Sequence, residues 1–582
     1  MTAQHLFDMR KYDARAIARH YQIRPFQVIW RALTVVWAFL GFIVGLQWDR
    51  WRNASEFAFA KRATQLREIL THLGPTFIKV GQALSTRPDL IRQDFLEELI
   101  KLQDQLPPFP TPIARRIIEQ ELDRTVEEAY SEISATPIAA ASLGQVYKAR
   151  LHTGETVAVK VQRPNLLPIL TLDLYLMRWA AGWIAPWLPL NLGHDLSLIV
   201  DEFGTKLFEE VDYLHEGRNA EKFAANFQNE PQVKVPAIFW RYSNRHVLTL
   251  EWIDGCKLTD IERIKQANLD ENDLIEVGVT SGLQQLLEHG FFHADPHPGN
   301  LFAMADGRMA YIDFGMMDQL EQHIKEALVD SVVHLINKEY SALARDFVTL
   351  GFLTPGTDIE PIIPALEAVF DKAIGESVKD FNFKTITDQF SALVYEYPFR
   401  IPAKFALIIR SLVTQEGLAL SLNSSFKIVE VAYPYVARRL LMEESPAFRQ
   451  RLVDVLFKDG KFQWQRLESL IAMARTRESL DLLPAAQLGL QYLLSPEGQF
   501  LRQQVIHALT EDDRLHTQEV QRIWTLIKDD IQPEQMFNAA WGALTEFSAE
   551  RAASLIPAMT SIVSPQTSNQ PPTAVRQDSS KQ

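Results

Sequence analysis

The sequence contains a single cysteine, Cys256, among 582 residues. One cysteine excludes an intrachain disulfide and a cysteine-rich zinc site, and it fits a reducing compartment. Basic residues are also in deficit, because 73 Asp and Glu outnumber 59 Lys and Arg and give a formal net charge of −14. An acidic chain lacks the clustered basic groups that bind a phosphate backbone, so we expect no nucleic-acid partner.

The amino terminus lacks a secretory signal, because no short apolar stretch with a small-residue cleavage site opens the chain. A longer uncharged apolar run begins instead at Ala32 and ends at Trp48. It is slightly short for a bilayer span, which needs about 20 residues. Trp30, Trp48 and Trp51 lie at its edges, as interfacial aromatics do, and arginines flank both sides. The run predicts membrane contact, spanning or lying on the surface, and the alternative is a buried helix or hairpin packed on the protein.

Apolar periodicity divides the rest of the chain into helical and strand-like stretches. Helical spacing is found in residues 61–106, 113–130 and 170–228, and again from residue 271 except in a loop at 291–318. Alternating patterns predict strands at 145–151, 156–162, 233–240 and 246–252. A small β-containing lobe is therefore expected between an N-terminal helical extension and a large helical region.

The strongest chemical signal is a loop with Asp295 and Asn300, followed by Asp313 in an Asp-Phe-Gly triplet. Kinases use an Asp-x-x-x-x-Asn loop to place a carboxylate near the nucleophile and an amide on Mg²⁺, and the later Asp also binds metal. Mg²⁺ prefers such oxygen ligands. The spacing therefore predicts ATP and Mg²⁺ as cofactors, with Asp295 catalytic and Asn300 and Asp313 as metal ligands. His293 and His297 are not expected to bind zinc, since no third soft ligand follows them.

A lysine upstream completes this pattern. Lys160 lies within the apolar strand 156–162, and the order of motifs matches the kinase strand whose lysine contacts the α- and β-phosphates. Such a lysine is normally held by a glutamate of the next long helix. The candidates within 201–219 are Glu202, Glu209 and Glu210, and the sequence alone does not choose among them.

Two further segments are expected to bind the nucleotide. The loop before the lysine strand is rich in alanine where ordinary kinases have several glycines, so its backbone is more restricted as a phosphate cradle. The hinge between the lobes is expected near residue 251, where backbone groups of Glu251 and Ile253 would meet adenine. The candidate loop residues are Ala139, Ala140, Ala141, Ser142, Leu143, Gly144 and Val146.

Taken together, these motifs resemble the UbiB/AarF-domain atypical kinases, in a cyanobacterial or plastid form. Lys79 and Gln82 match the family's Lys-x-Gly-Gln motif, Glu210 and Asp212 its Glu-x-Asp motif, and the alanine loop and the Asp295–Asp313 loops stand in the same order. The match covers about residues 60–320. It implies a two-lobed, α+β protein-kinase-like fold whose helical extension places Lys79, Gln82, Glu210 and Asp212 over the cleft as gating residues.

The resemblance also supplies expected domain boundaries. An N-terminal segment with possible membrane contact occupies 1–60, and the helical extension 61–135. The N-lobe spans 136–255 and the C-lobe 256–350, with the catalytic and metal loops. A helical C-terminal region covers 351–563, and the Pro-, Ser- and Gln-rich tail 564–582 is expected to be disordered.

The resemblance further implies ATP use in isoprenoid quinone or prenyl-lipid metabolism at a membrane. It implies a prenyl-lipid or quinone-precursor client, a biosynthetic enzyme complex as a partner, and a catalytic domain on the cytoplasmic or stromal side. No long activation segment follows Gly315, which counts against a peptide substrate. The alternatives are a conventional kinase for a protein or small molecule, and a nucleotide-binding scaffold without turnover.

Overall fold

In the computed structural model the chain divides into two compact units, Met1–Ala432 and Tyr433–Gln582. The described residues are 11–52, 56–85, 92–102, 107–184, 196–294, 298–336, 338–374 and 402–423, with single residues and short stretches between 397 and 522. The second unit is described chiefly by a hairpin of β12 (Phe457–Lys458) and β13 (Lys461–Phe462). The predicted tail 564–582 lies outside the described residues.

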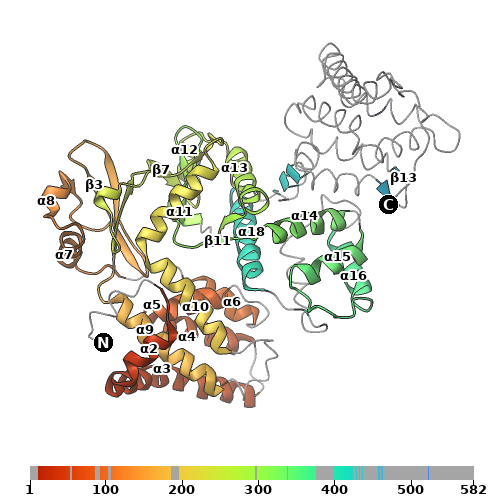
Figure 1. Ribbon diagram of the computed structural model, residues 1–582, viewed down its shortest axis with the longest axis horizontal. Helices are drawn as coiled ribbons and strands as arrows, with labels where there is room; N and C mark the ends of the chain where they lie inside the picture. The colour runs from red at the N-terminus through yellow and green to blue at the C-terminus, as the bar shows by residue number, and fades with distance from the viewer. Residues whose placement is uncertain are drawn as a thin grey trace, which may run out of the picture. The chain divides into compact units, whose positions relative to one another are not determined.

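An antiparallel sheet forms the smaller lobe (Figure 1). Its strands occur in the order β1 (Glu132–Ile133), β3 (Gly144–Arg150), β4 (Thr156–Gln162) and β6 (Val247–Glu251), and β2 (Ala139–Ala140) pairs with β3. The predicted strands at 145–151, 156–162 and 246–252 are therefore confirmed to within a residue or two.

The alternation of β4 gives the sheet two unlike faces. Val157, Val159 and Val161 are fully buried against α7 (Thr111–Leu122) and α8 (Val126–Ala129). Lys160, being one residue out of phase with the valines, lies on the opposite face, as period-2 side-chain geometry requires. The valine face is the core of the lobe, which leaves the lysine face free to form a site.

The long helical stretches of the sequence are interrupted where the chain needs special backbone geometry. Residues 61–106 do not form one helix, because Gly74 has a φ of 103° and Pro75 begins the next helix. Residues 170–228 are also divided. The resulting helices are α4 (Glu56–Leu73), α5 (Pro75–Leu84), α6 (Gln93–Ile100), α9 (Leu166–Ile184), α10 (Leu196–Val211) and α11 (Tyr213–Asn226).

The larger lobe begins with a small second sheet, β5 (Val233–Lys234), β10 (Met309–Tyr311), β9 (Leu301–Met304) and β7 (Gly255–Lys257) in that order. The predicted strand at 233–240 was too long, since only Val233 and Lys234 pair, and η2 (Trp240–Tyr242) follows. A two-stranded ladder joins β8 (Phe291–His293) to β11 (Met317–Gln319). The short 3-10 and π segments are η3 (Gln285–His289) and η4 (Pro298–Asn300).

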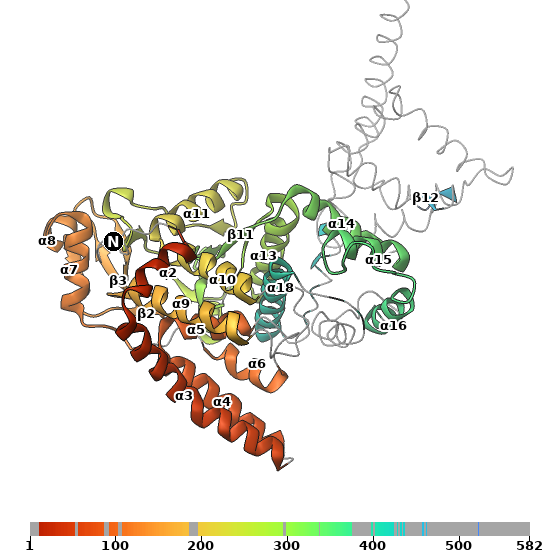
Figure 2. The ribbon, with the colours of Figure 1, turned by 60° about the horizontal axis from the view of Figure 1, so that its bottom comes forward.

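Helices make up the remainder of this lobe. They are α12 (Ile261–Gln266), α13 (Glu271–Gln284), α14 (Gln322–Ile336), α15 (Tyr340–Thr349), α16 (Ile363–Ile374) and α18 (Ala403–Leu422). At the N-terminus, α2 (Ala14–Gln22) packs on α9 and α10, and α3 (Pro25–Trp51) contains the whole apolar run 32–48. Figure 2 shows α3 and α4 side by side as a helical hairpin.

Candidate active site

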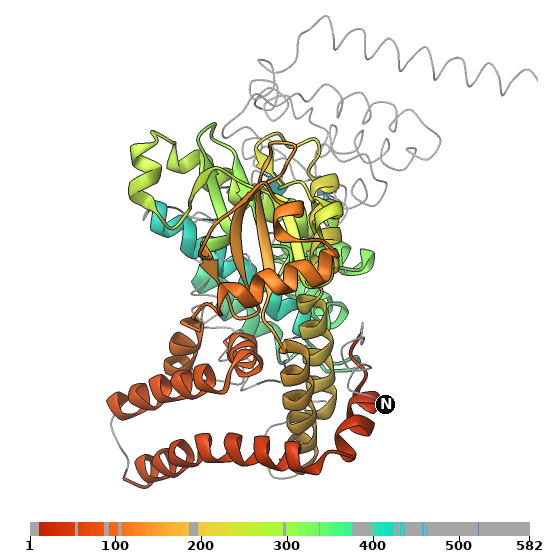
Figure 3. The ribbon, with the colours of Figure 1, turned by 90° about the vertical axis from the view of Figure 1, so that its left-hand side faces the viewer.

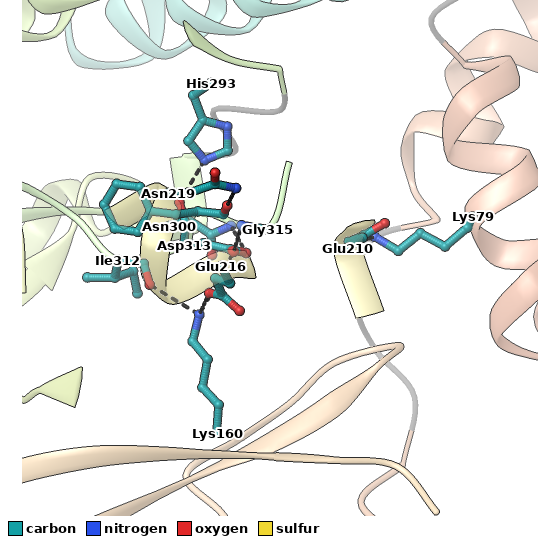
Figure 4. Close-up of polar contacts among 11 residues, drawn as sticks. Lys79, Lys160, Glu210, Glu216, Asn219, His293, Asn300, Ile312, Asp313 and Gly315 are labelled. Atoms are coloured by element: carbon teal, nitrogen blue, oxygen red, sulfur yellow. Dashed lines mark hydrogen bonds and ion pairs between the residues drawn. The ribbon is translucent and has the colours of Figure 1, made fainter. Parts of the chain in front are cut away.

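Lys160 points from β4 toward Glu216 and the Asp-Phe-Gly loop, and it forms three polar contacts (Figure 4). Its Nζ donates to Glu216 Oε1 over 2.5 Å and to the Ile312 carbonyl over 3.2 Å, and it lies 3.8 Å from Asp313 Oδ1. The side chain is largely buried and Glu216 is buried almost completely. A lysine so placed is a fixed positive charge beside the Asp-Phe-Gly loop.

The glutamate that holds Lys160 is Glu216, and the three candidates taken from the sequence were wrong. α10 ends at Val211, and Asp212 caps a new helix, α11, by accepting from the Leu214 N–H. Since the helix carrying the candidates stops there, Glu209 pairs with Lys206 and Glu210 with Lys79, and no described contact joins Glu202 to Lys160. The missed signal was Asp212 itself, a typical helix N-cap four residues before Glu216.

The two predicted metal ligands, Asn300 and Asp313, contact each other next to Lys160. Asn300 Nδ2 donates to Asp313 Oδ2 over 3.1 Å, and the Gly315 N–H donates to Asp313 Oδ1 over 3.1 Å. The His293 ring donates from Nε2 to the Asp313 carbonyl at 2.9 Å. His293 is therefore a positioning group for the loop, held in turn by its strand β8.

α11 fixes the same loop from a second direction. Asn219, one turn beyond Glu216, donates to the Phe314 carbonyl over 3.0 Å. The Phe314 ring is buried and packs against Phe223, with ring centroids 5.3 Å apart. One helix thus holds both Lys160, through Glu216, and the backbone after Asp313. Asn219 and Phe223 had no sequence signal beyond their helical spacing.

Burial and charge determine the ionisation of these groups. Burial alone would raise the pKa of Asp313, but Lys160, His293 and the Gly315 N–H together hold it well below its usual range. Burial lowers the pKa of Lys160, and Glu216 and Asp313 more than reverse that effect, so it is raised. Burial raises the pKa of Glu216 to about 7 in spite of Lys160. The site therefore contains a charged lysine, a charged aspartate and a glutamate that titrates near neutrality.

The donor set fits Mg²⁺. Asp313 presents an ionised carboxylate with a partly exposed side chain, and Asn300 adds an amide beside it. Both are the hard oxygen donors that Mg²⁺ prefers. Asp295, the predicted catalytic carboxylate, and His297 lie outside the described residues, so the role of Asp295 stays a prediction from the motif.

The alanine-rich loop forms a tight turn over the end of the sheet. Ala139 and Ala140 pair with β3, and the Ala141 N–H donates to the Gly144 carbonyl over 2.8 Å. Ser142 and Leu143 are buried, so these side chains hold the turn rather than face the cleft. A Cβ at Gly144 would lie 2.3 Å from the Tyr213 hydroxyl and 2.6 Å from the Val161 carbonyl oxygen. Glycine is needed there because two neighbours approach too closely for a side chain.

The face of the sheet around Lys160 is apolar and suits a flat base. The hinge candidates Glu251 and Ile253 border it at the end of β6. The Glu251 carboxylate pairs with Lys234 at 2.7 Å and its N–H donates to the Ala237 carbonyl over 2.8 Å, so neither group is available to adenine. In the described part of the chain, the Ile253 N–H has no hydrogen-bond partner. The cluster comprises Ala158, Tyr213, Leu248 and Leu250, with Val146, Ile238 and Trp252 packed against it.

The predicted gating residues are only partly brought together. Lys79 on α5 forms an ion pair with Glu210 on α10, and both side chains are largely buried (Figure 4). Gln82 does not point to the cleft with Lys79, because its amide donates to the Leu102 carbonyl over 2.7 Å. Asp212 acts as the cap of α11. Gln82 therefore stabilises α5, which carries Lys79, and Asp212 stabilises α11, which carries Glu216.

The segment after the Asp-Phe-Gly loop is short. Residues 317–319 form β11 against β8, and α14 begins at Gln322. The expectation that no long activation segment follows Gly315 is confirmed, because these residues pair directly with the strand that carries His293.

Comparison with known proteins gives two family matches. Residues 101–347 match the ABC1 atypical kinase-like domain, and residues 366–427 match the UbiB helical domain. A Synechocystis protein named slr1919 is 67% identical over 95% of this chain and 98% of its own. The Arabidopsis protein ACTIVITY OF BC1 COMPLEX KINASE 1, chloroplastic, is 48% identical over 86% of this chain and 76% of its own.

A solved structure is also similar. It is the complex of Rv3197 with erythromycin from Mycobacterium tuberculosis, which has 28% identity and a TM-score of 0.44. The match covers 59% of this chain and 87% of that one.

Proposed function

The chain belongs to the ABC1/UbiB family of atypical kinases, and we propose that it binds Mg-ATP and uses it to act on a prenyl-lipid or quinone precursor at a membrane. The observation that carries this proposal is the convergence of Lys160, Glu216, Asn300 and Asp313 within hydrogen-bonding or ion-pairing distance. Lys160 comes from the smaller lobe and Asn300 and Asp313 from the larger lobe, and they meet at one point.

Each group has a definite part in the proposed chemistry. Lys160, kept charged and oriented by Glu216, would bind phosphate oxygens through Nζ. Asn300 and Asp313 would hold Mg²⁺, which when bound neutralises charge on the β- and γ-phosphate oxygens. Asp295, from its place in the motif, would orient the attacking water or hydroxyl group. The apolar sheet face would hold adenine near Ile253.

Two features favour a lipid client over a peptide. The residues after Gly315 leave no activation segment, and the Lys79–Glu210 pair holds α5 of the helical extension to α10. The N-terminal helix α3 also exposes large apolar side chains. We therefore propose membrane association, with the catalytic domain on the cytoplasmic or stromal side and a biosynthetic enzyme complex as a partner.

ATP turnover by the purified protein tests the proposal. Phosphate release is measured with Mg²⁺ and γ-labelled ATP, with and without vesicles that contain a prenylated quinone precursor. We expect release that rises with the lipid and falls at least about a hundredfold in Asp313→Asn and Asp295→Asn. Asp306→Asn is the matched control, since Asp306 lies on an exposed turn and pairs only with Arg308.

The other outcomes separate the remaining functions. Label transferred to a defined protein or small acceptor would replace the proposal by a conventional kinase. Nucleotide binding without turnover or transfer under any of these conditions would indicate a scaffold. Unchanged turnover in Asp313→Asn would mean that the site lies elsewhere.

A further inference from the structure

The N-terminal helix α3 exposes a continuous apolar stripe along its length. The residues of the stripe, named below, recur every three or four positions. At 100° per residue they fall within about 80° of arc around the helix axis. Ile29, Val36 and Ile43 widen the exposed apolar surface on one side. We call the following set the α3 stripe: Phe26, Trp30, Leu33, Trp37, Leu40, Val44, Trp48 and Trp51.

The stripe is large for a surface in contact with water. Phe26 is 87% exposed, Trp37 79% and Trp51 76%. At about 200 Å² for each ring, the five aromatic side chains alone expose roughly 700 Å². The largest apolar patch of a typical soluble monomer is about 300–600 Å², so the stripe requires a partner. The alternative of a buried helix does not hold, since Phe42 is the one buried side chain among the described residues of α3, but the alternative of a hairpin packed on the protein holds for the side of α3 that faces α4.

The opposite side of α3 is packed on the protein. Val35, Ala38 and Phe39 join the core formed by α4, α5 and α6. Asp49 binds Arg62 of α4 at 2.6 Å. Gly45 allows this approach, because a Cβ there would meet the Arg62 guanidinium at 2.4 Å. Figure 3 shows α3 as the outermost helix at the bottom of the view, with α4 above it.

This packing is incompatible with α3 crossing a bilayer. α4 runs beside α3, so if α3 spanned the bilayer, α4 would enter the hydrocarbon with it. Lys61, Arg62 and Glu68 of α4 would then be buried in lipid, at a cost of about 2.5–3.5 kcal/mol for each charge at the centre. Arg31 also fixes α3 to the body of the protein through the fully buried Asp173 of α9, at 2.7 Å. α3 can contact lipid only by lying along its surface.

Charge favours a lipid surface over a second copy of the chain. Residues 11–52 contain seven Lys and Arg against two Asp, whereas the whole chain has a net charge of −14. No carboxylate belongs to the stripe, and Arg50 and Arg52 lie exposed at its end. Two copies meeting through this face would oppose like charges, while an anionic surface would attract both. Tryptophans spread along the stripe suit the headgroup region of a bilayer.

From this arrangement we propose that α3 docks flat on an anionic lipid surface through the α3 stripe, while α4 stays outside the bilayer. This deepens the proposed function, since it specifies how the enzyme would reach a lipid client, but docking needs neither ATP nor the client. α18 does not take part. It is the other described helix that is long and apolar enough to span a bilayer, and it packs against α13.

Vesicle flotation of the full chain without nucleotide tests the docking. The vesicles contain phosphatidylcholine with or without phosphatidylglycerol. We expect the chain to float with anionic vesicles, and the Trp37→Glu/Leu40→Glu variant to partition at least about tenfold less. Leu420→Glu on α18 is the matched control, being an exposed apolar residue on the other apolar helix. Asp313→Asn should float as the wild type does, so loss of turnover and loss of docking are separate results.

Thiol labelling tests the orientation. In a Cys256→Ser background, Trp37→Cys and Glu68→Cys are treated with an impermeant maleimide. Vesicles should slow labelling at position 37 at least about tenfold and leave position 68 unchanged, since Glu68 is exposed on α4. Protection at both positions would show a spanning hairpin and overturn the proposal. The proposal would also be overturned if the wild-type chain did not float with vesicles. A dimer that forms without lipid and that the Trp37→Glu/Leu40→Glu variant dissociates would overturn it as well.

Discussion

The Lys160–Glu216 pair allows a quantitative prediction about pH. Glu216 is 4% exposed, and burial raises the pKa of its carboxyl from 4.5 to about 7. That difference corresponds to roughly 3 kcal/mol against the ionised form. The ionised form is the one that orients Lys160, and a raised pKa means that it is lost as the pH falls through about 7. kcat/KM for ATP should therefore be about a tenth of its plateau at one pH unit below 7.

The variant Glu216→Gln removes this titration. It also replaces a charge-assisted hydrogen bond, worth about 1.5–3 kcal/mol, by a neutral one. Lys160 keeps the Ile312 carbonyl at 3.2 Å and Asp313 at 3.8 Å, so the protein should fold. We expect a plateau about ten- to a hundredfold lower and a pH profile without the acid limb.

Steady-state kinetics from pH 5.5 to 9 provide the assay, with Mg²⁺ equimolar to ATP. Glu202→Gln is the control, because Glu202 was a candidate on sequence grounds and lies on α10, the helix that stops before Glu216. It should change kcat/KM by less than about twofold. An acid limb that persists in Glu216→Gln, or an equal loss in Glu202→Gln, would refute the assignment of Glu216.

Two further predictions concern stability. Gly144→Ala should lower the free energy of unfolding by about 1–3 kcal/mol in chemical denaturation, because the added Cβ would lie 2.6 Å from a backbone oxygen of β4; an unchanged midpoint would contradict this packing. In a double-mutant cycle, Lys79→Ala and Glu210→Ala should show a coupling of about 1–2 kcal/mol, since the pair is largely buried. The half-exposed Lys206–Glu209 pair, whose lysine also pairs with Asp318, is the control and should give less than about 0.5 kcal/mol; equal couplings would remove the special role of the first pair.

Much of the candidate site could be predicted from the sequence because its signals are local. The alternation around Lys160 fixes its face of the strand, and the five-residue step from Asp295 to Asn300 fixes a loop of known chemistry. The structure brings Asn300, Asp313 and Lys160 together as that spacing predicted. These predictions depend only on the side-chain repeat of one strand or on the length of one loop, both of which can be read from the sequence.

Contacts between helices could not be predicted in the same way. The sequence offered Glu202, Glu209 and Glu210 as partners for Lys160, and Glu216 was missed because the end of α10 at Val211 was not known. Asp212 caps a new helix, α11, and the start of this helix decides that Glu216 is the carboxylate that meets Lys160. Gln82 likewise shares a helix with Lys79, yet the position of Leu102 draws its amide elsewhere.

The sequence by itself determined the family, the spacing of the kinase-like motifs and the presence of an apolar segment at 32–48, since composition and spacing suffice for these. Only the tertiary structure decided that Glu216 holds Lys160 and that α3 has one packed side and one exposed side. The physical reason is that hydropathy counts the apolar side chains without their direction. Whether they face a core, a bilayer or water depends on charged neighbours such as Arg62, which tertiary packing brings beside them.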